Sequence, residues 1–433
     1  MPDGVNYVQS GEPKQSYFTQ LLRSIFHLGS GELLARLFGV LTVILLGHKF
    51  GVVILGIYAL AQGISQCLQP LIDFGLRHVG ARLMARFPRS ASEIMHRVQR
   101  RRLGMAAAAV PFFLLYAALA RLPLDMKVFL GLFAGISAMY ALSLDWAAWG
   151  REQLRLVGLA KAIVPGSVLL CVVIAIGSQH VLAWLLVGSL FGYSLQAIVF
   201  WLWWKRHRLA IGEQEHGVAA IGEALQWQRT SIMGLAWLGN LAFATIDMLM
   251  LGILSSPDQV GLYSAAYRVL GQVLMTYYLL TNVLYPQLAR QSADERVRML
   301  RPRILLAMFA SGCAVAALVA MSRGPVLTIL FGSAFLKSAP LLLVLACAIP
   351  LDFLVNYLNS AYIAWSMERK VLVCAVVAAA SNVVLNWIGI PRYGAMAAAV
   401  NTVISYAIYL ACLAIAGRTA KELQHPTLES ASI

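Results

Sequence analysis

The chain has 433 residues, of which 60% are hydrophobic and only 12% are charged, and its formal net charge is +15. Soluble domains carry about 25% charged residues, so this composition argues against a large soluble helical protein. The mean hydropathy of +0.73 favours a chain that lies largely in a lipid bilayer. A positive net charge is also typical of nucleic-acid binding, but its distribution along the chain, described below, predicts no nucleic-acid partner.

A helix that spans a bilayer needs about 20 mostly apolar residues. Runs of this kind predict an all-α, polytopic membrane protein with twelve transmembrane helices. They lie at approximately 24–47, 51–76, 103–121, 127–149, 156–178, 181–204, 231–254, 259–288, 304–321, 340–364, 371–390 and 394–416. The longest inner connection divides them into two lobes of six helices. The expected units are an N-terminal lobe (1–204), a cytoplasmic linker (205–230), a C-terminal lobe (231–416) and a cytoplasmic tail (417–433).

The distribution of Lys and Arg predicts the orientation. With both termini placed inside, 25 of the 34 basic residues fall in inner segments, six in outer connections and three within or beside spans. This is a strong positive-inside signal, which predicts a multi-pass membrane protein with both termini in the cytoplasm. The basic runs at 100–102, 205–208 and 296–303 are accordingly expected to contact anionic lipids of the inner leaflet.

The two halves contain one similar segment. "LLGHKFGVVILGIYALA" (45–61) and "MLGILSSPDQVGLYSAA" (250–266) share Gly47/Gly252, Gly56/Gly261 and Tyr58/Tyr263 at a single offset. Because each half has an even number of predicted spans, the repeat is parallel. Such two-lobed bundles are typical of transporters that bind substrate between the lobes near the midplane.

Ionisable groups are costly inside a bilayer and usually mark functional sites. Glu32 and Arg36 share one face of the first predicted helix, which favours a water-filled cavity, although a simple mutual ion pair remains the alternative. Arg268 lies in the eighth predicted span. The other candidate polar residues inside spans are Asp247 in the seventh and Asp352 with Asn356 in the tenth.

Four further charged residues lie close to the predicted cytoplasmic ends, where their long side chains reach water at low cost. They are Asp73, Arg77, Asp145 and Lys161. Asp73 and Arg77 are interpreted first as an ion pair that fixes helix packing, and second as part of the site.

Signals of enzymes, metals and cofactors are weak. The six cysteines lie in apolar runs without CxxC spacing, the eight histidines form no HExxH, and the chain has neither a P-loop nor GxSxG. We therefore expect no enzyme activity, no metal site and no cofactor.

Several segments in sequence order resemble a known group of transporters. They are "RLFGVLTVILLGHKFG" followed by "GIYALA", "DFGL" (73–76), "LDWAAWGREQLRLVGLAKAI" (144–163), "IDMLMLGIL…VGLYSAAYRVL" (246–270) and "SNVVLNWIGIPRYGAMAAAVNTVIS" (381–405). Over nearly its whole length the chain resembles the polysaccharide-transport branch of the multidrug/oligosaccharidyl-lipid/polysaccharide (MOP) exporter superfamily, which includes the O-antigen (Wzx-type) flippases.

The resemblance implies two six-helix lobes in a V and a flippase that moves an undecaprenyl-diphosphate-linked glycan to the outer leaflet for surface polysaccharide. It implies that Arg36 and Arg268 from opposite lobes bind the diphosphate, with Arg77 and Lys161 as further basic candidates. Glu32, Asp247, Asp352, Asp73 and Asp145 are the candidate acidic or ion-coupling residues, and Asn356, Asn382 and Asn386 the candidate polar residues of the cavity. Polysaccharide polymerase and chain-length proteins are candidate partners.

Two other functions stay open from the sequence. A multidrug or cation antiporter of the same superfamily is the first alternative, although arginines in a cavity would repel a cationic drug. A membrane-bound polysaccharide polymerase or ligase is the second, and the short outer connections argue against it.

Overall fold

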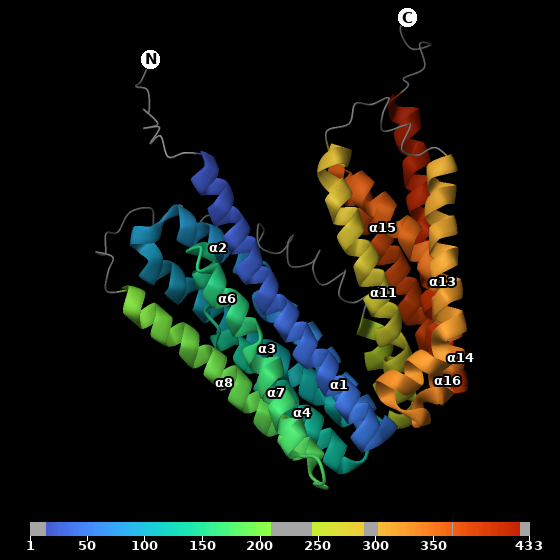
Figure 1. Cartoon of the computed structure of the whole chain (residues 1–433), viewed down its shortest axis with the longest axis horizontal. Coiled ribbons are helices and arrows are strands. Elements are labelled where there is room, and N and C mark those ends of the chain that lie inside the picture. The colour runs from blue at the N-terminus through green and yellow to red at the C-terminus, as the bar shows by residue number, and fades with distance from the viewer. Residues whose placement is uncertain (1–13, 209–244, 290–301, 366, 425–433) are drawn as a thin grey trace, which may run out of the picture.

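The computed structural model describes residues 14–208, 245–289, 302–365 and 367–424, and every regular element in these ranges is a helix. The helices form two bundles that separate toward one end of the molecule and meet at the other, in a V (Figure 1). The first turn of α1 and the last turn of α16 lie at the separated end. Residues 209–230 of the predicted linker, 231–244 of the seventh span and 296–301 of one basic run lie outside the described ranges.

The first bundle is built from the N-terminal half of the chain. Its elements are α1 (Lys14–Asp73), α2 (Leu76–Arg86), η1 (Pro88–Ser90), α3 (Ala91–Leu119), α4 (Leu124–Ala138), η2 (Met139–Leu142), α5 (Asp145–Gly150), α6 (Leu154–Lys161), α7 (Ile163–Ile174) and α8 (Val181–Arg208). The described part of the second bundle contains helix Thr245–Leu254, α11 (Pro257–Ala289), α13 (Pro302–Phe331), η3 (Ser333–Ser338), α14 (Ala339–Ala346), α15 (Ala348–Ala364) and α16 (Glu368–Gln424).

Two of these helices each comprise two predicted spans. At 1.5 Å per residue, the 60 residues of α1 would be about 90 Å long, far beyond a bilayer core of about 30 Å. The backbone turns at Gly51, where φ is 79°, and at Gly394 of α16, where φ is 57°. Glycine adopts positive φ without a Cβ clash, so both turns fall where the sequence predicted a short outer connection.

Most of the predicted spans are confirmed as helical in the described residues. The span predicted at 127–149 is interrupted at Ser143 and Leu144, between η2 and α5. Within the described ranges, seven helices are long and apolar enough to cross a membrane, and a further bent pair, Ser333–Ala346 with Ala348–Ala364, has an angle of 44°. Pro350 lies in the first turn of α15, three residues after the break at Cys347. Its missing N–H cannot donate a hydrogen bond to the preceding turn, which favours a bend here. Apolar side chains such as Leu119, Phe191 and Met321 are exposed on the outside, as expected for a surface that faces lipid.

The two bundles contact each other at the closed end of the V through the segments that the sequence repeat had matched. A Cβ on Gly56 would lie 2.4 Å from the Pro257 carbonyl oxygen and 2.7 Å from the Gly261 nitrogen. A Cβ on Gly261 would lie 2.1 Å from the Val52 carbonyl oxygen. The matched glycines of the two halves therefore pack backbone to backbone across the interface.

Candidate functional site

A cavity of about 310 Å³ is lined by residues of both bundles. It is lined by Arg36 and Gln62 from α1 and by Arg268, Gln272 and Met275 from α11. The two halves of α1 both reach it because the helix turns back at Gly51. The structure thus brings together the two arginines that the sequence placed in opposite lobes, and we call this space the arginine cavity.

Arg268 has no carboxylate partner among the described residues, whereas Arg36 has one. One of its terminal nitrogens donates a hydrogen bond to the Gln62 side-chain oxygen of the opposite lobe. Its Nε is buried and has no hydrogen-bond partner among the described residues. No carboxylate in the described ranges lies within ion-pair distance of Arg268, so its charge is available to an anion in the cavity.

Arg36 pairs with Glu32, as the alternative interpretation of that helix face predicted, but the pair is not isolated. Arg36 Nε lies 3.1 Å from Glu32 Oε1, and Lys161 Nζ lies 2.9 Å from Glu32 Oε2. A second Arg36 nitrogen contacts the Met275 sulfur in the opposite lobe. One carboxylate is therefore shared by two cations, which leaves this side of the cavity net positive.

Close packing of two glycines explains how Lys161 reaches Glu32. A Cβ on Gly31 would lie 2.1 Å from the Gly158 carbonyl oxygen, so the backbones of α1 and α6 touch there. Glu32 and Lys161 follow these glycines by one and three residues, and their side chains meet beside the contact. The sequence suggested Lys161 as a residue near the cytoplasmic end and as a further basic candidate for the site. It did not predict the pairing with Glu32, because the α1–α6 contact is tertiary.

The predicted pairing of Asp73 with Arg77 is wrong. α1 ends at Asp73, and the chain turns through Phe74 and Gly75, with φ of 35° and 81°, before α2 begins. Residues four apart share a helix face only when the helix is continuous, so this turn separates the two side chains. Arg77 instead pairs with Asp145 at 3.0 Å, and Asp73 pairs with Arg102 at 2.9 Å.

Arg102 is a residue whose role the sequence analysis missed, because it was expected to face lipid headgroups within the run at 100–102. Its side chain is fully buried and also donates to the Ser143 carbonyl oxygen at 2.5 Å. The residue spacing provided one signal. Arg102 follows the apolar residues Ile94 and Val98 at intervals of four, so it lies on the same helix face, and both of these residues are buried. Arg100 and Arg101 are exposed, as predicted for that run.

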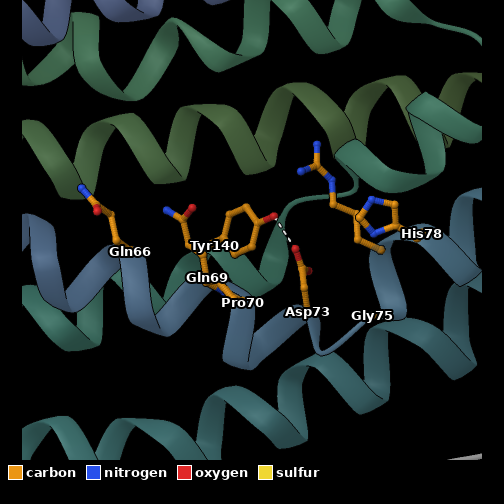
Figure 2. A pocket seen from close by; sticks show the side chains of 8 residues that line it. Gln66, Gln69, Pro70, Asp73, Gly75, His78 and Tyr140 are labelled. Atoms are coloured by element: carbon orange, nitrogen blue, oxygen red, sulfur yellow. Dashed lines mark hydrogen bonds between the residues drawn. The ribbon is translucent and has the colours of Figure 1, made fainter. Parts of the chain in front are cut away.

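A second, smaller space of about 200 Å³ lies along α1 toward the open end of the V, and we call it the polar pocket. Gln66, Gln69 and Asp73 of α1 contribute to it in a row, with the Tyr140 ring beside Gln69 and with His78 at its far end (Figure 2). Tyr140 donates its hydroxyl to Asp73 Oδ2 at 2.8 Å. Arg77 also lines this pocket.

Asp247 lies inside the second bundle and not at either of these cavities. Its Oδ2 accepts hydrogen bonds from the hydroxyls of Thr402 at 2.7 Å and Tyr263 at 2.9 Å, and its Oδ1 accepts one from Asn386 Nδ2 at 2.5 Å. Asn386 Nδ2 also contacts Asn382 Oδ1 at 2.9 Å. All of these donors are neutral, so within the described residues this buried carboxylate has no cation to balance its charge.

Asp352, the other acidic residue in this bundle, is also buried, with 4% of its surface exposed. The Tyr406 hydroxyl bonds to its carboxyl group, while Oδ2 has no partner among the described residues. Asn356 donates to the Asp352 backbone oxygen at 3.2 Å. Asn356, Asn382 and Asn386 thus lie with the buried carboxylates and do not line the arginine cavity or the polar pocket.

No group of three or more His, Cys, Asp or Glu side chains comes together as a metal site within the described part of the chain. Arg36 and Arg268 line the arginine cavity, and Arg36 is linked through Glu32 to Lys161. Arg77 with Asp145 and Asp73 with Arg102 form neutral pairs near the polar pocket. The arrangement places guanidinium groups from both bundles at one cavity near their junction.

The helices of spanning length among the described residues indicate a multi-pass membrane protein, and its two-bundle fold is similar to that of solved MOP-superfamily transporters. A lipid II flippase MurJ in an inward closed conformation aligns with a TM-score of 0.67 at 13% identity over 90% of this chain and 87% of that one. An inward-facing multidrug resistance MATE transporter of the MOP superfamily aligns with a TM-score of 0.65 at 13% identity, over 95% and 100% of the two chains.

A third similar structure is a Vibrio cholerae MATE transporter, with a TM-score of 0.53 and 13% identity over 94% of this chain and 98% of that one. No protein-family model matches the sequence, and no curated protein matches it significantly. At this level of identity the likeness establishes the fold, and the substrate has to be argued from the cavity itself.

Proposed function

We propose that this protein is a flippase that moves a polyprenyl-diphosphate-linked oligosaccharide from the cytoplasmic to the outer leaflet of a bacterial inner membrane. The observation that carries the proposal is the arginine cavity, where guanidinium groups from both lobes face one space. Guanidinium groups bind phosphate oxygens with strong, often bidentate, charge-assisted hydrogen bonds. A diphosphate is therefore the anionic group that this cavity fits best.

The mechanism follows from which lobe holds each arginine. A diphosphate bound to Arg36 and Arg268 would attract both lobes at once and would replace the direct Arg268–Gln62 hydrogen bond. With the positive-inside orientation, the V opens to the cytoplasm, where the substrate enters. Binding then favours closure on that side, and Glu32 moderates the positive field so that release remains feasible. The likeness to a lipid II flippase is in line with this substrate class.

The second candidate is a multidrug or cation antiporter, which the similarly high likeness to a MATE transporter supports. The buried carboxylates Asp247 and Asp352 would suit a cationic substrate. They lie away from the arginine cavity, however, and a cationic drug in that cavity would meet like charges in a medium of low dielectric constant. We therefore favour an anionic substrate in the cavity and assign the carboxylates to coupling.

Replacing Arg36 or Arg268 with alanine is expected to reduce export of surface polysaccharide. Loss of a hydrogen bond to a charged group costs about 1.5–3 kcal/mol, which corresponds to roughly 10- to 100-fold weaker binding. The measurement is surface polysaccharide in cells whose own flippase is deleted, at matched levels of inserted protein. Arg392→Ala, an exposed arginine near the turn at Gly394, is the matched control and should retain export. Wild-type export by both cavity variants would exclude the proposal.

Replacing Asp247 with asparagine is expected to abolish the dependence of transport on a proton or sodium gradient. A buried carboxylate held only by neutral donors gains strongly from binding a proton or a cation, and an amide lacks that negative charge. The measurement is the initial rate of lipid flipping in proteoliposomes with each gradient imposed in turn. Asp258→Asn, an exposed acid in the first turn of α11, is the control. If the variant still responds to both gradients as the wild type does, Asp247 has no coupling role.

A further inference from the structure

A row of glutamines connects the arginine cavity with the polar pocket. Gln62, Gln66 and Gln69 are spaced four and three residues apart on the second half of α1, so they share one helix face. Gln62 lines the arginine cavity, while Gln66 and Gln69 line the polar pocket. Gln62 and Gln66 are separated by about 6 Å along the helix axis, so the two spaces adjoin in the direction of the open end.

The two spaces differ in charge. Near the arginine cavity, the basic groups Arg36, Arg268 and Lys161 are accompanied by one carboxylate, Glu32. Around the polar pocket, by contrast, both charged residues of the lining are paired, Asp73 with Arg102 and Arg77 with Asp145. The first space therefore selects an anion, whereas the second suits a polar ligand without net charge.

The polar pocket has hydrogen-bonding groups that no described residue uses. Gln66 accepts a hydrogen bond from Thr245 through its side-chain oxygen, and its amide nitrogen is without a partner in the described ranges. Gln69 makes a long 3.4 Å contact from its amide nitrogen to the Tyr193 hydroxyl, and its oxygen has no partner within those ranges. A free donor thus lies one turn from a free acceptor. Each hydroxyl of a sugar both donates and accepts hydrogen bonds, so a sugar ring matches this pair.

The remaining lining is also typical of a site for a neutral polar ring. The Tyr140 ring lies beside Gln69 (Figure 2). Burial lowers the pKa of the His78 imidazole, on α2 outside the membrane-spanning helices, below its ordinary value, which favours the neutral form of the ring. Trp149 is 37% exposed and packs edge-on against His78 at 5.5 Å. The pocket's volume of about 200 Å³ is below the roughly 300–1,000 Å³ of drug-sized sites, which suits a single ring.

We propose that the polar pocket binds an uncharged sugar ring of the lipid-linked glycan while the diphosphate lies between Arg36 and Arg268. This inference rests on the proposed function and adds a glycan-reading subsite to it, in which the Gln66 amide group donates and the Gln69 oxygen accepts. Specificity for the glycan then resides in the N-terminal lobe, on the same α1 face that leads from the arginine cavity to the open end.

The test compares two probes on the purified full-length protein in nanodiscs, undecaprenyl diphosphate alone and the undecaprenyl-diphosphate-linked glycan extracted from the host cell. The wild type is expected to bind the glycan form about 10-fold more tightly, as two added hydrogen bonds allow. Gln66→Leu with Gln69→Leu should remove most of this gain and leave the affinity for undecaprenyl diphosphate unchanged. Both single variants are measured as well, and only proteins with the thermal stability of the wild type are compared.

The possible outcomes separate the two proposals. Gln153→Leu, at an exposed glutamine outside both spaces, should bind both probes like the wild type. A wild type that binds both probes equally, or glutamine variants that keep the full gain, would overturn the sugar subsite and leave the flippase proposal intact. If the wild type binds neither probe, or if Arg36→Ala and Arg268→Ala bind both unchanged, the proposed function itself fails and the subsite with it.

Discussion

Replacing Gly261 with alanine is expected to open the closed end of the V. The new Cβ would lie 2.1 Å from the Val52 carbonyl oxygen, and backbone atoms cannot yield as a flexible side chain can. Overpacking of this kind typically costs about 1–3 kcal/mol, and the lobes relieve it by separating where they touch. Gly56→Ala should act in the same direction, since its Cβ would meet the backbone of Pro257 and Gly261 from the other lobe.

The measurement is the distance between spin labels at positions 121 and 337, exposed basic residues of the two bundles near the closed end, in a protein without its six native cysteines. Both glycine variants should shift the distribution to longer distances and reduce export. Gly104→Ala is the matched control, because its Cβ would meet no atom within 4 Å. An unchanged distribution in both interface variants would mean that this glycine contact does not hold the two lobes together.

Replacing Arg102 with methionine is expected to destabilise the N-terminal lobe strongly. The change would leave the Tyr140 hydroxyl as the remaining hydrogen-bond partner of the buried Asp73 carboxylate among the described residues. It would also remove the hydrogen bond that Arg102 donates to the Ser143 carbonyl oxygen. Breaking a buried ion pair on one side costs about 3–5 kcal/mol, because the remaining charge is uncompensated. Thermal unfolding in detergent should show a clear loss of stability.

A double-mutant cycle tests the origin of this loss. Arg102→Met combined with Asp73→Leu should be more stable than Arg102→Met alone, because the uncompensated carboxylate is gone. Arg100→Met, at an exposed position two residues away, should change stability by no more than about 0.5 kcal/mol. Equal stability of Arg102→Met and the wild type would argue that the buried pair contributes nothing to the lobe.

Much of the fold was predictable because the bilayer imposes strong constraints on sequence. Apolar runs of spanning length predicted the helices, and the breaks between these runs lie close to the turns that the structure shows at Gly51 and Gly394. The repeat predicted that the Gly56 and Gly261 segments are equivalent. That these two glycines pack against each other was not predictable, because the offset between the halves says nothing about how they dock.

For the candidate site, too, some features were predictable from the sequence and others were not. The cost of placing charge in lipid singled out Arg36 and Arg268 from sequence alone, and the structure places both at one cavity. The partners of the other charges did not follow from spacing. Asp73 and Arg77 are four residues apart, yet a turn at Phe74 and Gly75 gives each a different partner.

The sequence by itself therefore predicted an all-helical membrane protein in two halves, with arginines inside predicted spans, and the helices are confirmed in the described residues. These properties depend on composition, periodicity and the cost of transferring charge into lipid, which are local to each segment. Only the tertiary structure decided that Lys161 shares Glu32 with Arg36, that Arg102 is buried, and that Gln66 and Gln69 line a pocket next to the arginine cavity. The physical reason is that ion pairs and cavities form between helices distant in the chain, where close approach of small residues such as Gly31 and Gly158 sets which side chains meet.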